Sequence, residues 1–262
     1  MPTAEPFDPD IIKANLKTNR IGKQIVVYDR TSSTSDVARR YAQDEVNDGL
    51  VIFAEEQTAG RGRANNKWHS KRSESILCSI VLIGGKLNAE LLSLTCAVAV
   101  AEAIGESTKG WAQIKWPNDI LLNDKKVAGI LLESQIDGGN NVYIVGIGIN
   151  CHQTKDSFPP ELKPIATSID IESGSFTDRI SLAKRLLTSV ENWLEEASRK
   201  SEKVIDQWRN LSIQLGHRVK LLYDGKEFAG NCIGIDPEQG LVLQLDTGGV
   251  RIFDTAHTTI LK

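Results

Sequence analysis

The chain has 262 residues, of which 40% are hydrophobic and 25% are charged, and its net charge at pH 7 is −3. This composition excludes a disordered or fibrous protein, and a chain of this length can bury a sizeable core without disulfide bonds. The acidic balance excludes a protein whose whole surface attracts nucleic acid or anionic lipid, so any anion-binding function must be local.

The cysteines and the N-terminus indicate where the protein works. The four cysteines lie in separate apolar runs without a C-x-x-C pair, as expected for small hydrophobic side chains in a reducing compartment. The first 15 residues lack the basic start and apolar stretch of a signal peptide, and no run approaches about 20 uninterrupted apolar residues. We therefore expect a cytoplasmic protein that does not contact membranes.

The first part of the chain alternates strands and helices. Hydrophobic patterning predicts strands at 24–28, 50–56 and 76–83, a helix that begins at the serines 32–33 and runs through Val46, and a helix at 88–105. The helix at 88–105 is hydrophobic on almost every side, so we expect it to pack broadly against a sheet.

The second part is richer in strands. Four short strands separated by turn residues, at 114–116, 120–122, 127–134 and 142–149, favour antiparallel hairpins. A loop at 152–177 leads to an amphipathic helix at 178–200 and a shorter one around 204–208, and after Gly216 short alternating strands predict a small β-barrel. We expect an α+β fold with a mixed or antiparallel sheet, helices on one face, and a terminal barrel.

The polar stretch from residue 58 to residue 74 is too long to be a simple connection. It contains two glycines and five basic residues, with no acidic residue before Glu74. Glycines beside arginines let backbone amides and guanidinium groups approach a phosphate or carboxylate closely. The stretch is therefore the first candidate for an anion site, although a solvated, disordered Gly-Arg loop would have the same composition.

Two further segments carry polar groups beside apolar strands. Pro117 fixes a turn that presents the amide of Asn118 and the carboxylate of Asp119, a pattern that alone is usually only a turn. Lys126 begins an apolar strand, where it either points into a pocket as a fixed cation or guards a sheet edge.

Several common active-site motifs are absent from the sequence. There is no Walker-type phosphate loop, and the glycines at 146 and 148 lack the third glycine and following helix of a dinucleotide fingerprint. They leave room for a flat ligand or mark a β-bulge. The four histidines lack metal-like spacing, and there is no nucleophile elbow, which disfavours zinc chemistry and elbow-type hydrolysis.

Taken in chain order, five segments resemble the motifs of the biotin protein ligases. They are Ser33-Thr34-Ser35, the string from Gln57 through Gly60-Arg61-Gly62-Arg63 to Trp68, Lys115-Trp116-Pro117-Asn118-Asp119, residues 126–133, and Gly146-Ile147-Gly148-Ile149-Asn150. The resemblance covers the chain from about Ile25 to the C-terminus. It implies a class II synthetase-like catalytic domain at 1–212 and an SH3-like barrel at 213–262.

The resemblance also implies an activity. Biotin protein ligases use ATP to convert biotin to biotinyl-5′-AMP, release pyrophosphate, and transfer biotin to one lysine of a biotin carboxyl carrier protein. Joining a carboxylate to a phosphate requires fixed positive charge. The resemblance also implies Mg²⁺, held mainly by the ATP phosphates, with no protein ligands assigned.

Roles follow from the resemblance residue by residue. Ser33, Thr34 and Gln57 would bind the ureido ring of biotin, and the rest of the biotin site would comprise Ser35, Arg61, Gly62, Arg63, Lys126, Gly129, Gly146 and Gly148. ATP or adenylate would contact Arg61, Arg63, Trp68, Asn118, Lys126 and Asn150, with Trp68 stacked on adenine. The catalytic residues would be Lys126, Arg61 and Asp119, which would assist deprotonation of the acceptor lysine.

Several departures from the family pattern affect these roles. Serine at position 35 replaces the usual asparagine and has a shorter reach. Ala64-Asn65-Asn66 replaces a further Arg-Gly pair, so we expect weaker retention of the adenylate. Lys71 and Ser73 stand where proline and glycine are usual, which would alter how the loop is hinged.

About 20 residues precede the first predicted strand, too few for the helix-turn-helix domain that some relatives carry, so we expect no DNA binding.

Two other functions remain as alternatives. A lipoate or octanoate ligase would share the fold, but has an R-R-x-x-G-G-G-like stretch in place of Gly60-Arg61-Gly62-Arg63. A nucleic-acid-binding module could use the Gly-Arg loop, but net acidity and 6% aromatic residues argue against it. The strand at 142–149 could pair across a two-fold axis in a homodimer or lie inside the sheet.

Overall fold

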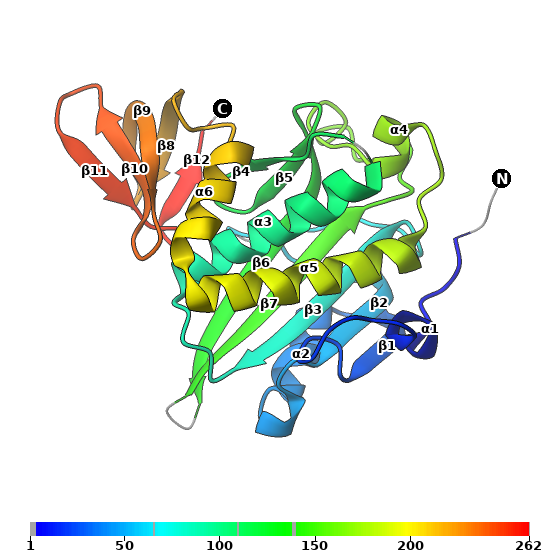
Figure 1. Cartoon of the computed structure of the whole chain (residues 1–262). Helices are drawn as coiled ribbons and strands as arrows, with labels where there is room; N and C mark the ends of the chain where they lie inside the picture. The colour runs from blue at the N-terminus through cyan, green and yellow to red at the C-terminus, as the bar shows by residue number, and fades with distance from the viewer. Residues whose placement is uncertain (1–3, 65, 109, 138–139, 262) are drawn as a thin grey trace.

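The computed structural model describes residues 4–64, 66–108, 110–137 and 140–261. A seven-stranded sheet in the order β1-β2-β3-β7-β6-β5-β4 forms its centre (Figure 1). The strands are β1 (Ile25–Thr31), β2 (Val51–Gln57), β3 (Ser75–Ile83), β4 (Gln113–Lys115), β5 (Asp119–Leu122), β6 (Lys125–Asp137) and β7 (Asn140–Asn150). Only β1 and β2 pair in parallel, which makes the sheet mixed, as expected.

One face of this sheet is covered by three helices, α3 (Ala89–Thr108), α5 (Arg179–Arg199) and α6 (Ser201–Leu211). By length and composition alone, α3 could cross a membrane. Most of its side chains are buried, and it lies against both α5 and β6. Its all-round apolarity is explained by this position in the core, where every side of the helix meets apolar neighbours.

The opposite face of the sheet carries α2 (Thr34–Tyr41), so the prediction of helices on one face is wrong for this helix. Val37 and Ala38 of α2 pack on Ile52 and Val81 in an apolar cluster separate from the main core, which contains Val51 and Phe53. Successive strand residues point to opposite faces, and here both faces are apolar, so both must be covered. The helix is also shorter than predicted: it ends at Tyr41, and Val46 lies in a separate 3-10 turn at Glu45–Asn47, where its side chain is exposed and so does not continue the buried face of the helix.

Two short helices were not predicted, α1 (Pro9–Lys13) and α4 (Ile169–Ser173). Each spans five residues, too few to show a helical period in the sequence.

The C-terminal segment forms a second antiparallel sheet beside α6, in the order β11-β10-β9-β8-β12 (Figure 1). Its strands are β8 (Arg218–Tyr223), β9 (Lys226–Asp236), β10 (Gly240–Leu245), β11 (Val250–Phe253) and β12 (Thr258–Ile260). The core runs without interruption from Trp208 of α6 into this sheet through Leu221 and Phe253. The two sheets are therefore joined by buried apolar contacts.

The strand expected at 142–149 is β7, which lies between β3 and β6 and is hydrogen-bonded on both sides. It cannot pair with a second copy without opening the sheet, so this route to a homodimer is wrong. The outer strands of the large sheet are β1 and β4.

Candidate active site

Residues from every motif in the sequence line one cavity of about 220 Å³. It lies where the first turn of α2, the end of β2, the loop after β2 and the glycine-containing parts of β6 and β7 meet. Of the predicted site residues, the cavity is lined by Ser33, Thr34, Ser35, Gln57, Arg61, Gly62, Arg63, Trp68, Asn118, Asp119, Lys126, Gly129, Gly146 and Gly148. Only Asn150 is missing from it.

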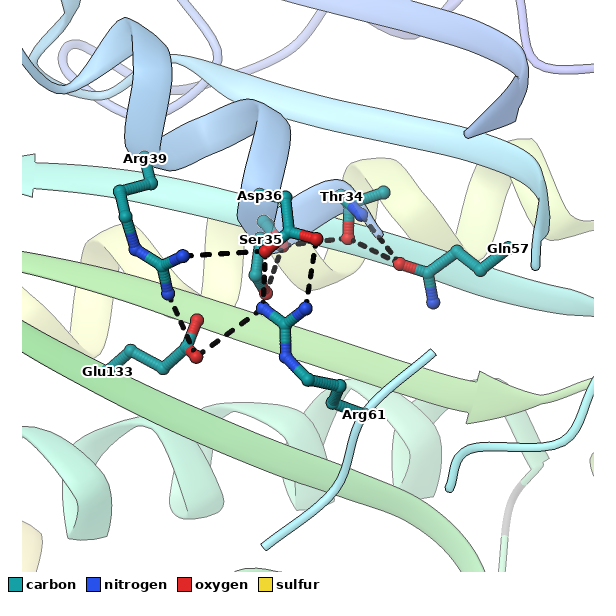
Figure 2. Close-up of polar contacts among 8 residues, drawn as sticks. Thr34, Ser35, Asp36, Arg39, Gln57, Arg61 and Glu133 are labelled. Carbon is teal, nitrogen blue, oxygen red and sulfur yellow. Dashed lines mark hydrogen bonds and ion pairs between the residues drawn. The ribbon is translucent and has the colours of Figure 1, made fainter. Parts of the chain in front are cut away.

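One end of the cavity is a hydrogen-bonded polar cluster (Figure 2). The parallel pairing of β1 and β2 brings Thr31 beside Gln57, so α2, which starts directly after β1, begins next to Gln57. The carbonyl oxygen of Gln57 accepts hydrogen bonds from the backbone N–H of Thr34 at 2.7 Å and from its hydroxyl at 3.0 Å. This leaves the Gln57 NH₂ group pointing away from Thr34, as a donor.

Ser79 of β3 completes this cluster and was missed by the sequence analysis. Its hydroxyl lies 2.8 Å from that of Thr34 and 3.1 Å from that of Ser35. A Cβ atom on Gly146 would lie 3.0 Å from the Ser35 Oγ, so the glycine leaves space for this serine. Ser35 thus supports the polar end through Ser79, and the only sequence signal for Ser79 is a serine inside an apolar strand.

The loop between β2 and β3 folds as a tight hairpin rather than as a solvated chain. The Trp68 N–H donates to the carbonyl of Gly60 at 3.0 Å, and the Gly62 N–H donates to that of Asn66 at 2.7 Å. Within the hairpin Ala64 adopts a φ of 51°, a left-handed conformation that costs a residue with a Cβ some energy.

The Trp68 ring lies flat over two glycines that face each other across β6 and β7. A Cβ on Gly148 would lie 2.6 Å from the ring, and one on Gly129 would lie 3.0 Å from it. Any side chain at Gly148 would push the ring away. The Trp68 Nε1 is buried without a hydrogen-bond partner among the described residues.

The two arginines of the hairpin have different partners. Arg61 makes two hydrogen bonds to Asp36, at 2.7 and 2.9 Å (Figure 2). These bonds lower the pKa of Asp36 and raise that of Arg61. Arg63 is more deeply placed and bonds only neutral oxygens, those of Asn118, Thr255 and Thr258, and its burial lowers the pKa of its guanidinium.

A lysine–carboxylate pair closes the other end of the cavity. The Lys126 Nζ lies 2.5 Å from an Asp119 oxygen and 5.8 Å from the centre of the Trp68 ring. Asn118 anchors the turn before Asp119, because its NH₂ group donates to the Ile130 carbonyl at 2.9 Å. Lys126 therefore points into the site, and the edge-guard interpretation is wrong.

A second cavity, of about 390 Å³, adjoins the first and is also lined by Trp68. Five residues line both cavities: Asn66, Lys67, Trp68, Asp119 and Lys126. One wall comes from the 152–177 loop and is apolar apart from Glu161, with Phe158, Leu162, Ile165 and Ala166. Sequence analysis did not find this wall, because a loop with scattered apolar residues carries no periodic signal.

Asn150 belongs to this second cavity and not to the first. Its amide donates to the Thr167 carbonyl at 2.9 Å, and its oxygen accepts from Gln153 at 3.2 Å. Both ends of the buried side chain are therefore engaged within the protein, and Asn150 holds the 152–177 loop against β7.

The chemistry available in the two cavities is that of cations and hydrogen-bond donors. Among the described residues, no three His, Cys, Asp or Glu side chains converge as metal ligands. Burial raises the pKa of Cys78, Cys96 and Cys151 to about 12, so these thiols are not ionised nucleophiles near neutral pH.

Comparison with known proteins identifies relatives over most of the chain. Residues 27–150 match the model of the Biotin/lipoate A/B protein ligase family. The bifunctional ligase/repressor BirA of Bacillus subtilis is 34% identical over 92% of this chain and 76% of its own length. The biotin–[acetyl-CoA-carboxylase] ligase of Mycobacterium tuberculosis is 31% identical over 96% of both chains.

Solved structures agree with these sequence relatives. The biotin protein ligase of Aquifex aeolicus in complex with biotin and ATP superposes with a TM-score of 0.79 at 27% identity, over 92% of this chain and 99% of that one.

Proposed function

Because the chain belongs to the biotin protein ligase family, we propose that it activates biotin with ATP as biotinyl-5′-AMP and transfers biotin to a lysine of a biotin carboxyl carrier protein. The observation that carries the proposal is the placement of Lys126 and Asp119. They stand at the junction of two cavities, one with a polar end suited to a ureido ring and one with an apolar wall suited to a purine.

The first cavity suits biotin in shape and polarity. A ureido ring offers one acceptor and two donors, and the polar end supplies the Gln57 NH₂ group together with the Ser33 and Thr34 hydroxyls. With its ring at this end, the valerate chain of biotin runs over the glycines of β6 and β7 toward Lys126. The Trp68 ring must shift to admit it, because it now lies against Gly148.

In the activation step, a biotin carboxylate oxygen attacks the α-phosphorus of ATP and pyrophosphate leaves. Two anions must approach each other, so the step depends on cations fixed beforehand at the junction. Lys126 can bridge the carboxylate and the phosphate once its contact with Asp119 is exchanged for the ligand. Arg63, a buried cation without a carboxylate in direct contact, adds positive charge on the side of the C-terminal sheet.

The second cavity suits the nucleotide. Its apolar wall gives a flat face for adenine, and Trp68 can stack on the other side of the base. The ATP phosphates would hold Mg²⁺, and Asp119 and Glu161 are the carboxylates of this cavity that could contact the ion directly or through water. Asn150 acts indirectly, by fixing the loop that forms the wall.

In the transfer step, the acceptor lysine attacks the acyl carbon and AMP leaves. The incoming ammonium must first lose a proton, and the Asp119 carboxylate lies at the junction where that proton would be taken. The hairpin excludes water from the mixed anhydride until the carrier arrives.

Other parts of the proposal concern the whole chain. We propose a catalytic domain at 1–212 and an SH3-like barrel at 213–262, supported by the change to short antiparallel strands after Gly216 and the pairing of the last strand with β8. A cytoplasmic location and the lack of DNA binding remain predictions. A lipoate ligase is disfavoured, because the Mycobacterium tuberculosis relative is a biotin ligase.

Exchange of pyrophosphate into ATP, with Mg²⁺ and either biotin, lipoate or no acid, tests the activation step. We expect exchange with biotin alone, and loss by about 100-fold or more in Lys126→Ala, as for removal of one group that stabilises transition-state charge. The variant should keep its melting temperature, since Lys126 is a partly exposed side chain paired at a rim. Exchange with lipoate would move the protein to the sister activity, and equal loss of stability and exchange would remove Lys126 from the site.

A further inference from the structure

Four charged side chains form a closed network at the wall of the biotin cavity (Figure 2). Asp36 and Arg39 belong to α2, Arg61 to the hairpin, and Glu133 to β6. Both carboxylate oxygens of Asp36 accept hydrogen bonds from Arg61, and one of them also accepts from Arg39 at 3.4 Å. The Glu133 carboxylate forms ion pairs with Arg39 at 3.1 Å and with Arg61 at 3.5 Å. Two cations and two anions thus balance one another.

Arg61 is the only member of this network that also lines the biotin cavity, and its guanidinium is turned toward α2 (Figure 2). The Arg61 backbone pairs with that of Lys67, next to Trp68, whose ring lies 5.8 Å from the Lys126 Nζ. To hold a carboxylate or phosphate placed beside Lys126, the Arg61 side chain must therefore turn away from Asp36, so the ligand competes with Asp36 for it. Arg39 can stay with Asp36 and Glu133 when Arg61 leaves, so the two carboxylates keep a partner.

We propose that Asp36 is a positioning residue that competes with the ligand for Arg61, and that Arg39 sets how tightly Arg61 is held. This inference rests on the proposed function, because it takes biotin as the ligand. Asp36 weakens the binding of the ligand's anionic group, and Arg39 counteracts Asp36 by sharing its charge. Both act through Arg61 and touch no substrate.

The network makes two substitutions act in opposite directions. Asp36→Asn removes the competing charge and frees Arg61 for the ligand. Arg39→Gln leaves Asp36 and Glu133 with Arg61 as their sole guanidinium in the network, so Arg61 is held more firmly. Because the pairs are partly exposed, we expect changes of about two- to fivefold in affinity.

Equilibrium binding of biotin and of its uncharged alcohol analogue, biotinol, tests the proposal by titration calorimetry. Asp36→Asn should tighten biotin binding, Arg39→Gln should weaken it, and biotinol should bind all forms alike. Asp29→Asn is the matched control. It breaks another two-pronged pair, with Arg72 of the same loop, but Asp29 lies outside the cavity lining, so biotin binding should not change.

Weaker or unchanged biotin binding in Asp36→Asn, or equal changes for biotin and biotinol, would overturn the role of Asp36. A similar gain in Asp29→Asn would show that loosening the loop is sufficient and would also overturn it. If Asp36→Asn does not fold, Arg39→Gln tests the proposal alone: weaker biotin binding supports it, and unchanged or tighter biotin binding overturns it. Failure of the wild-type protein to bind biotin or biotinol would instead contradict the proposed function.

Discussion

Arg61 and Arg63 stand two residues apart, yet their electrostatic situations are opposite. Arg61 forms a half-exposed ion pair with Asp36, whereas Arg63 is largely buried and bonded only to neutral oxygens. Burial lowers the pKa of the Arg63 guanidinium and outweighs the attraction of Asp119, Glu90 and Asp254, and an anionic ligand would relieve that cost. Of the two, Arg63 is therefore the better prepared to hold the adenylate phosphate.

Substitution of Arg63 should weaken retention of the biotinyl-AMP intermediate. In Arg63→Ala, the loss of a charge-assisted hydrogen bond should speed release of biotinyl-AMP by roughly 10- to 100-fold. Chromatography of the small molecules that escape from the enzyme without carrier measures this. Arg72→Ala removes another loop arginine, one paired with Asp29 away from the cavity, and should leave retention unchanged. Equal retention in Arg63→Ala and the wild-type protein would exclude Arg63 from the adenylate site.

Ser73 shows how one departure from the family pattern is accommodated. The resemblance leads us to expect glycine here, and Ser73 has a φ of 60°, a left-handed conformation that glycine adopts at lower cost. Its hydroxyl donates to Glu55 at 2.8 Å and its N–H to the Glu55 carbonyl at 3.0 Å. These bonds offset the strain and fix the end of the hairpin loop.

At the scale of elements, a buried ion pair between α5 and β2 anchors the loop that follows β2. Arg179 at the start of α5 lies 2.9 Å from Glu55 of β2, and both side chains are 2% exposed. Arg179 also donates to the carbonyls of Glu5 and Ser75, and Glu55 accepts from the Phe7 N–H. The pair thus ties the N-terminal segment, the loop and α5 together.

Breaking this pair should destabilise the fold rather than the chemistry. Arg179→Met leaves Glu55 buried without its counter-charge and should lower the free energy of unfolding by about 3–5 kcal/mol. Urea unfolding measures the change. Arg185→Met, on the same helix but in an exposed pair with Glu106, should cost less than about 1 kcal/mol. Similar losses in the two variants would show that burial of the pair does not matter.

At the scale of the whole molecule, the C-terminal segment lines the first cavity with Thr258, Thr259 and Ile260, and it also supports the site through Gln214. This buried side chain accepts from the Trp116 N–H at 2.7 Å and donates to the Trp116 carbonyl at 3.0 Å. The neighbouring Ile213 N–H donates to the Ile114 carbonyl at 3.1 Å. The chain between α6 and β8 therefore supports the turn that carries Asn118 and Asp119.

Replacing Gln214 should affect both stability and activity. Gln214→Leu leaves two buried backbone groups of Trp116 without partners and should cost roughly 1–3 kcal/mol for each group that stays unsatisfied. Because the turn loosens, the rate of pyrophosphate exchange at saturating biotin should fall even at temperatures where the variant is still folded. Asn210→Leu, at an exposed position on α6, should change neither quantity. Normal exchange in Gln214→Leu would show that the turn holds its geometry unaided.

The sequence by itself determined much of the local structure and the composition of the site. Strand and helix periods follow from which side chains must be buried, so most elements were predicted close to their observed bounds. Every site residue that the motifs named lines the biotin cavity except Asn150, which lines the second cavity.

Only the tertiary structure showed which residues far apart in the chain lie next to each other. The placement of α2 on the second face, the inner position of β7, and the second cavity depend on how elements pack, which local pattern does not encode. The same holds for Ser79, Gln214 and the pairing of Asp36 with Arg61. Their partners are 44, 98 and 25 residues away along the chain, and only folding brings such groups within hydrogen-bond distance.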